Sequence, residues 1–192
     1  MKELTNDIFY TVLGEYDDCI IDYCLLVDDA PYAGESSHRR AIEAALSKCS
    51  LKVKEPWTYD LSRARASKFD ANDLLFFPEA EWKIKSGKTT AYDKPYEDTD
   101  IPYWFAFVEP PHGTSPVERD GVVLRDEYGR EDFDRINEAL FPNGTEELEV
   151  YKWSTDWSEY FEPGLEWWGA ACWSIYDKTL GRYVVIMASA TD

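Results

Sequence analysis

The residue types best suited to chemistry gather near the C-terminal end of the sequence. Five of the eight tryptophans lie between Trp153 and Trp173, with carboxylates interleaved among them. Aromatic rings beside acids can stack on a sugar, hold a cationic ligand or anchor a protein partner that carries basic residues. We therefore expect a binding surface here, with eight candidate residues: Asp156, Trp157, Glu159, Tyr160, Glu162, Glu166, Trp167 and Trp168.

The same tryptophans also have a purely structural interpretation, because aromatic side chains fill the core of a small sheet and seal its edges. Trp167 and Trp168 are adjacent, so on a strand they would point to opposite faces, and one would lie outside the core. Residues 154–164 are typical of an acidic, aromatic loop between two strands. The sequence leaves open how many of these rings are core and how many are surface.

Catalytic and cofactor motifs fail when their spacing is checked. Residues 86–90, Ser-Gly-Lys-Thr-Thr, resemble the end of a phosphate-binding loop, but the glycine required five residues before Gly87 is Trp82. The sequence has two histidines, His38 and His112, but no nucleophile elbow that would supply a catalytic serine beside either of them. Paired carboxylates, the residues of glycoside hydrolysis, are not informative in a chain with 38 acids. We predict no catalytic residue and no cofactor, and we favour a non-enzymatic protein over an enzyme.

The four cysteines are scattered through apolar stretches and form no close Cys-x-x-Cys pair. Zinc and redox sites usually show that spacing, so reduced core cysteines are expected and no metal site is predicted. The residues concerned are Cys19, Cys24, Cys49 and Cys172.

The charge is strongly negative and unevenly distributed. The net charge is -18 overall, with -8 on residues 1–35, +4 on residues 36–94 and -14 on residues 95–192. Such a field repels nucleic acids and anionic lipids and attracts basic protein surfaces, so direct nucleic-acid binding is not expected. Carboxylates also keep a protein soluble, but this charge is well beyond the magnitude of about 2 to 8 that serves a small domain.

The elements that position these residues indicate one α+β domain over residues 1–192, with a mainly antiparallel sheet and two or more short helices packed on it. Amphipathic spacing predicts a helix from Ser36 or Ser37 to Cys49, with His38 packed on its apolar face, and a second helix over residues 131–141. Apolar and aromatic runs predict strands. The predicted strands cover residues 8–13 and 19–27 as a hairpin, 103–108, 148–153, 167–176 and 183–190, the last central in the sheet and paired with 167–176.

The N-terminus and the lengths of the apolar runs indicate where in the cell the protein is expected. The longest apolar runs are far shorter than the roughly 20 residues of a membrane helix, and the acidic N-terminus shows no secretory or transit signal. We therefore expect a cytoplasmic protein without a membrane span.

The chain is small, acidic and rich in tryptophan, and it has no catalytic motif. In this general profile it resembles the bacterial immunity and inhibitor proteins that neutralise basic toxins or nucleases. The resemblance implies a non-enzymatic protein that docks an acidic, aromatic surface on a basic partner. Two versions are an immunity protein for a toxin and a nucleic-acid mimic that disarms a restriction or CRISPR effector. Charge would speed association, and aromatic anchors would supply affinity.

Two other classes stay open at this point. One is a small-molecule or carbohydrate binder, or an enzyme, that uses Trp157, Trp167 or Trp168 with nearby acids. A deep pocket holding a carboxylate of raised pKa would favour that class, whereas a flat acidic face with exposed aromatics would favour the inhibitor. The other is an acidic domain whose charge serves solubility alone.

Overall fold

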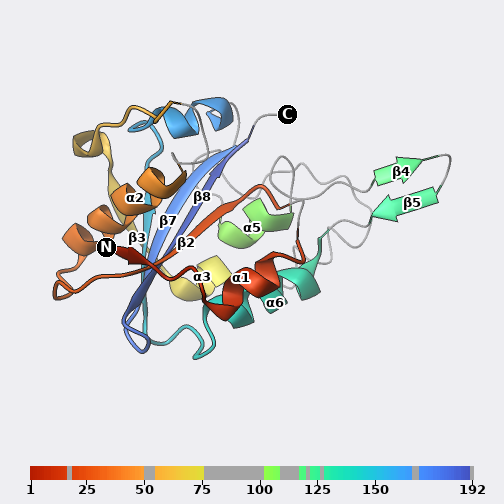
Figure 1. Ribbon diagram of the computed structural model, residues 1–192, viewed down its shortest axis with the longest axis horizontal. Coiled ribbons are helices and arrows are strands. Elements are labelled where there is room, and N and C mark those ends of the chain that lie inside the picture. Colours follow the sequence, from red (N-terminus) through yellow and green to blue (C-terminus); the bar gives the residue numbers. More distant parts are fainter. Residues whose placement is uncertain are drawn as a thin grey trace.

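A six-stranded antiparallel sheet forms the centre of the fold, with helices packed on both of its faces (Figure 1). The strand order is β1-β2-β8-β7-β6-β3, so β8 is central as predicted. This confirms the expected α+β class. The computed structural model describes residues 1–16, 19–49, 55–75, 102–108, 117–119, 122–125, 128–165 and 169–190. The strands of this sheet are β1 (Lys2–Glu3), β2 (Asp22–Val27), β3 (Ala66–Phe69), β6 (Leu148–Trp153), β7 (Ala170–Asp177) and β8 (Arg182–Ser189).

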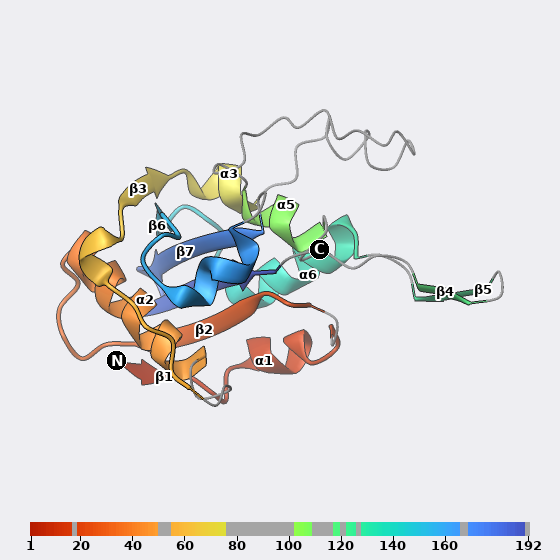
Figure 2. The ribbon, with the colours of Figure 1, turned by 90° about the horizontal axis from the view of Figure 1, so that it is seen from above.

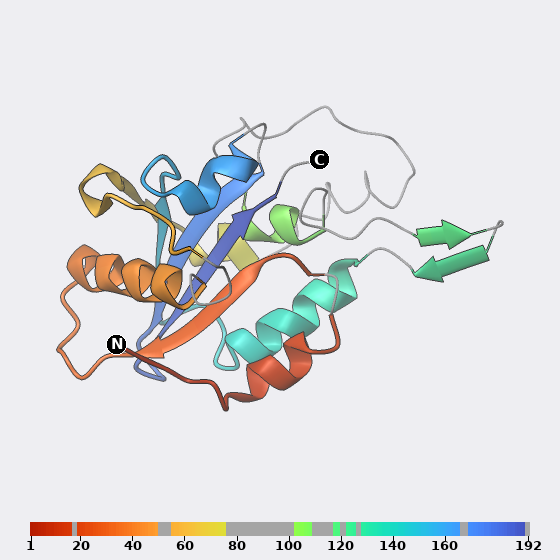
Figure 3. The same cartoon turned by 45° about the horizontal axis from the view of Figure 1, so that its top comes forward.

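The helices divide between the two faces of the sheet (Figures 2 and 3). One face packs against α2 (Glu35–Cys49) and the 3-10 helix η3 (Glu159–Gly164). The other face packs against α1 (Ile8–Leu13), α3 (Ala71–Leu75), α5 (Tyr103–Val108) and α6 (Arg130–Leu140). A short 3-10 helix, η2 (Leu61–Arg63), precedes β3, and β4 (Val117–Arg119) pairs with β5 (Val122–Arg125) in a separate two-stranded sheet.

The alternation of side chains along β8 explains why the sheet is covered on both sides. Val184 and Ile186 belong to the hydrophobic cluster beneath α1, α5 and α6, whereas Tyr183, Val185 and Met187 belong to the cluster beneath α2. Successive side chains of a strand point to opposite faces, so an uninterrupted apolar run requires cover on both sides. The apolar sequence of this strand therefore determined its central place.

Several predicted elements are confirmed. The helix α2 begins at Glu35, close to the predicted start, and Ser37 accepts a hydrogen bond from the Ala33 N–H. The helix α6 ends at Leu140, and β6 has the predicted bounds. The hairpin of β7 and β8 is also confirmed, with Asp177 paired with Arg182 next to the turn.

Two predicted strands are helices, and these predictions were wrong. Residues 8–13 form α1, because the Asp7 side chain caps the first turn by accepting the Phe9 N–H and Phe9 packs in the core. The predicted hairpin with residues 19–27 is therefore absent, and β2 pairs with β1 and β8 instead. Aromatic and β-branched residues favour strands only weakly, and tertiary packing overrides that preference.

The second correction concerns residues 103–108, which form α5. Tyr103, Ala106 and Phe107 are all buried, and their i, i+3, i+4 spacing places them on one side of a helix. Because the segment is almost entirely apolar and aromatic, its helical periodicity could not be recognised in the sequence. No helix in the described part of the chain is long and apolar enough to cross a membrane.

Candidate functional site

The connection between β6 and β7 carries five of the eight predicted binding residues. Asp156, Trp157, Glu159, Tyr160 and Glu162 lie in the turn and the 3-10 helix η3 that follow β6. The other three predicted residues, Glu166, Trp167 and Trp168, lie outside the described residues.

The two described aromatic candidates are buried. Trp157 is only 1% exposed and packs edge-on against Phe161 in the cluster beneath α2. Tyr160 is 6% exposed, and its hydroxyl donates to the Asp22 carboxylate at 2.9 Å. In this structure both rings hold η3 on the sheet, so the carboxylates of the connection are the groups that a partner can reach.

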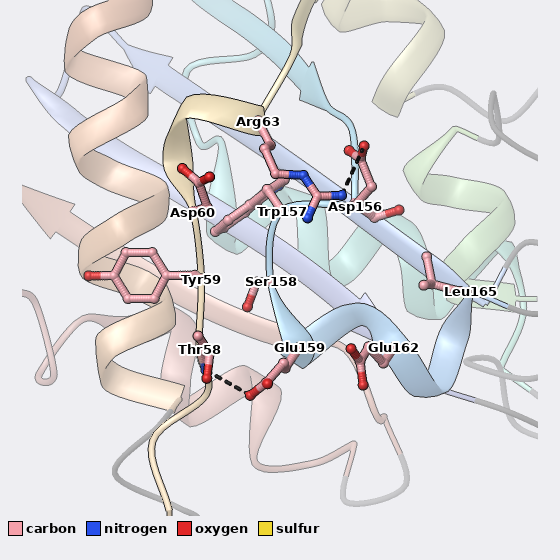
Figure 4. Close-up of a pocket in the computed structure, with 11 residues that line it drawn as sticks. Thr58, Tyr59, Asp60, Arg63, Asp156, Trp157, Ser158, Glu159, Glu162 and Leu165 are labelled. Carbon is pink, nitrogen blue, oxygen red and sulfur yellow. Dashed lines mark hydrogen bonds and ion pairs between the residues drawn. The ribbon is translucent and has the colours of Figure 1, made fainter.

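The carboxylates border an open groove of about 380 Å³ (Figure 4). One wall is the segment from Thr58 to Arg63, and the other is the connection from Thr155 to Glu162, with Leu165 at one end. The groove therefore joins two parts of the chain that are about a hundred residues apart in sequence.

Backbone hydrogen bonds fix the two walls against each other. The Asp60 N–H donates to the Trp157 carbonyl at 2.8 Å, and the Glu159 N–H donates to the Thr58 carbonyl at 3.0 Å. Tyr59 and Ser158 face each other as an isolated antiparallel bridge. The Glu159 carboxylate also accepts the Thr58 N–H at 2.9 Å (Figure 4). The shape of the groove is thus set mainly by main-chain contacts, to which the Glu159 carboxylate adds one side-chain hydrogen bond.

Asp156 is neutralised from within the chain. The Arg65 guanidinium donates to both oxygens of this carboxylate, at 3.0 and 3.2 Å, and Arg63 lies 3.8 Å away. Burial raises the pKa of Asp156, but hydrogen bonds from Ser154 and Arg65 outweigh it and hold the pKa below its ordinary value. Asp156 therefore stays ionised at neutral pH, and the two arginines already compensate its negative charge.

Asp60, on the facing wall, is also held in its ionised form. Its carboxylate accepts hydrogen bonds from the Ser62 N–H at 3.0 Å and the Ser62 hydroxyl at 2.6 Å. The hydroxyl hydrogen bond is the main reason that its pKa lies below the ordinary value. A carboxylate of this kind does not act as a general acid at neutral pH, because that role needs a raised pKa.

Glu159 and Glu162 lie on the same side of η3. Residues three apart in a 3-10 helix eclipse each other, so both carboxylates project from one line along the helix. Both residues are exposed and both line the groove. Glu162 makes no side-chain hydrogen bond or ion pair with any residue that the structure describes. This leaves a negative charge at the groove that the described chain does not compensate.

Apolar surface accompanies these charges. Leu165 is 51% exposed and Tyr59 is 40% exposed, and both line the groove. The Tyr59 hydroxyl donates to Glu43 on α2 at 3.1 Å, which holds the ring in place. A long cationic side chain could thus lay its aliphatic stem on apolar atoms while its head meets a carboxylate.

A pair of glycines fixes the end of the groove at Leu165. A Cβ atom on Gly164 would lie 2.2 Å from the Gly169 carbonyl oxygen, and one on Gly169 would lie 2.1 Å from the Ala190 oxygen. The Ala190 N–H donates to the Gly169 carbonyl at 3.0 Å. Only residues without side chains allow the chain to pass this close to itself and to Ala190, which follows β8.

Sequence reasoning missed the wall formed by residues 58–63. The signal that could have found it is the pattern Asp60-x-Ser62, typical of a side chain that caps a short turn. Nothing in the sequence indicates that this turn meets the tryptophan-rich connection, because the contact depends on how β3 pairs with β6.

The other candidate chemistry lies elsewhere. The segment that resembles a phosphate-binding loop, residues 86–90, and His112 lie outside the described residues. Cys24, Cys49 and Cys172 are buried, Cys19 is half-buried, and none of these four described cysteines forms a disulfide. No group of three or more potential metal ligands occurs among the described residues.

His38 is fully buried on the sheet-facing side of α2, which confirms the packed histidine predicted from its helical position. Its Nδ1 lies 2.8 Å from the Ser174 hydroxyl, and its Nε2 lies 3.1 Å from the Tyr32 hydroxyl. Burial lowers the pKa of His38 to about 4, so the ring is neutral at neutral pH. Ser174 is also fully buried, which leaves no access for a substrate to this pair.

Neither a protein-family model nor a curated protein sequence matches this chain. A function is therefore inferred from the groove itself.

Proposed function

We propose that this chain is a non-enzymatic binding protein that receives a cationic segment of a basic protein partner in the groove between residues 58–63 and η3. The observation that carries the proposal is the negative charge of Glu159 and Glu162, of which Glu162 has no side-chain partner among the described residues, in a groove that the exposed Leu165 also lines. This combination suits an arginine or lysine side chain, whose apolar stem and charged head need different surroundings.

The electrostatics of the whole chain support a partner of positive charge. A net charge of -18 speeds encounter with a basic surface at low salt and discourages binding to nucleic acids. A toxin, a nuclease or another effector with a nucleic-acid channel presents such a surface, so immunity protein and nucleic-acid mimic both remain versions of the proposal.

The open form of the groove favours a binding protein over an enzyme. The pKa values of Asp60 and Asp156 are lowered, and neither carboxylate is poised to donate a proton at neutral pH. The volume of about 380 Å³ lies in the range of small-ligand sites, so a small cationic or carbohydrate ligand stacked on Tyr59 is the second candidate.

A charge-matched comparison tests the proposal. The double variant Glu159→Gln/Glu162→Gln removes two charges from the groove, and Glu146→Gln/Glu147→Gln removes two exposed charges at the opposite end of β6. Both variants and the wild type are immobilised and exposed at low salt to lysate of the source organism, followed by elution with a salt gradient and mass spectrometry.

We expect a basic protein that the wild type and the Glu146/Glu147 variant retain and the groove variant loses. Its release at moderate salt would fit an electrostatic interface, because screening weakens exposed charge pairs. Equal retention by both variants would contradict the groove as the binding site. An affinity that is unchanged between low and high ionic strength would contradict mimicry of a nucleic acid.

A further inference from the structure

The groove carries a positive charge as well as negative ones. Among the described residues that line it, Arg63 alone is basic. Its side chain extends from η2 on one wall toward Asp156 on the other, whereas Glu159 and Glu162 lie at the opposite end of the groove (Figure 4). The groove is therefore bipolar, with a guanidinium at one end and two carboxylates at the other.

The Arg63 guanidinium is loosely held. Its Nη2 lies 3.8 Å from Asp156 Oδ2, too far for a hydrogen bond, and 60% of its side chain is exposed. Arg65, by contrast, donates to both oxygens of the same carboxylate, at 3.0 and 3.2 Å. Because Asp156 keeps this bidentate partner, Arg63 can turn to another anion without leaving the carboxylate uncompensated.

The backbone that carries Arg63 is fixed on both sides. The Asp60 side chain caps η2, and the Arg63 N–H donates to the Asp60 carbonyl at 3.1 Å. Arg39 on α2 donates to the Leu61 and Ala64 carbonyls at 2.6 and 3.0 Å, which holds the turn before and after Arg63. Arg63 therefore reaches a ligand by side-chain motion alone.

The two ends of the groove place different demands on a ligand. A segment with only basic residues meets Glu159 and Glu162 at one end but the like charge of Arg63 at the other, and like charges in contact disfavour a partner. A segment that also carries a carboxylate satisfies both ends, because a guanidinium binds a carboxylate through two parallel hydrogen bonds. The aliphatic part of such a segment would lie near Leu165.

We propose that Arg63 is a specificity-determining residue, which makes the groove select a segment that carries an acidic residue beside its basic one and disfavour a segment that is only basic. This inference rests on the proposed function, because the groove must first receive a basic segment. The net charge of -18 attracts the basic partner as a whole, and Arg63 decides which of its segments fits.

Synthetic peptides with blocked ends test this role. An all-basic peptide has arginines in a background of glycine and serine, and a matched set has one serine replaced by aspartate, at a different position in each peptide. Affinities are measured by fluorescence anisotropy at low salt. The informative quantity is the affinity of the best aspartate peptide divided by that of the all-basic peptide, compared between wild type and variants.

Arg63→Gln should lower this ratio roughly two- to fivefold, the scale of one exposed ion pair. It should do so by weakening the aspartate peptide and strengthening the all-basic one. Arg63→Lys keeps the charge and should keep most of the ratio. Lys178→Gln is the matched control, because it removes one exposed positive charge beyond the end of β7 that is far from the groove, and the ratio should not change.

The outcomes separate this inference from the proposed function. An unchanged ratio in Arg63→Gln, or an equal fall in Lys178→Gln, would overturn the role of Arg63, while the groove stands if Glu159→Gln/Glu162→Gln weakens both kinds of peptide. If the glutamate substitutions weaken neither kind, the groove itself is contradicted. If no peptide binds the wild type, both proposals fail.

Discussion

Two polar regions lie on the α2 side of the sheet, and they are built in opposite ways. The groove carries exposed carboxylates, of which Asp156 is paired with arginines and Glu162 has no partner among the described residues. The His38 network is buried and joins neutral rings and hydroxyls through hydrogen bonds.

This contrast indicates that the buried network contributes to stability and that the exposed groove is available for binding. Exposed charges contribute little to folding because water already solvates them, so they are free to interact with a partner. Buried hydrogen-bonding groups become costly as soon as one partner is removed. Substitutions in the two regions should therefore separate stability from binding.

The largest effect is expected for Ser174→Ala in the network. It leaves the Trp153 indole N–H and His38 Nδ1 without their shared partner in the core, and each such group costs about 1 to 3 kcal/mol. We expect the free energy of unfolding, measured with urea, to fall by about 3 kcal/mol. Ser67→Ala on the exposed edge strand β3 is the control, and an equal loss there would contradict the comparison.

The pH dependence of stability comes next. Burial lowers the folded-state pKa of His38 to about 4 from 6.5. The unfolded chain therefore takes up the proton first, and this stability is complete above pH 6.5 and is lost as the pH falls toward 4. Between pH 7.5 and 5 we expect a loss of about 2 kcal/mol. Carboxylates titrate too, so the difference between wild type and His38→Gln is the quantity to measure, and a zero difference would disprove the assignment.

A smaller effect is expected for Arg65→Ala at the groove. The Arg65 side chain is 70% exposed, so its ion pair with Asp156 should be worth only about 0.2 to 1 kcal/mol, and less at high salt. Urea unfolding at two salt concentrations measures it. A loss as large as that of Ser174→Ala would show that the groove is part of the structural core.

The smallest effect on stability is expected for Glu159→Gln/Glu162→Gln. Both residues are exposed, and the oxygen of a glutamine at position 159 can still accept the Thr58 N–H, so the change in the free energy of unfolding should stay within about 0.5 kcal/mol. Binding of a basic partner should nevertheless fall at least tenfold. Loss of both stability and binding would mean that these glutamates support the fold.

The class of the fold and several of its main elements could be predicted from the amino-acid pattern alone. The helical spacing of Ile42, Ala45 and Leu46 predicted α2, and the apolar run of β8 predicted a central strand, because both patterns reflect burial along a regular element. The net charge and its concentration near Asp156 to Glu162 also came from the sequence, since composition needs no geometry.

Other features depend on contacts between distant parts of the chain and could not be predicted. Residues 8–13 and 103–108 form helices, because the cap at Asp7 and the packing of Tyr103 and Phe107 outweigh the preference of these segments for strands. Trp157 is buried beneath α2, and Arg65 contacts Asp156 although the two residues are 91 positions apart in the sequence. Such contacts depend on which strands become neighbours, and a local pattern carries no information about a partner that distant.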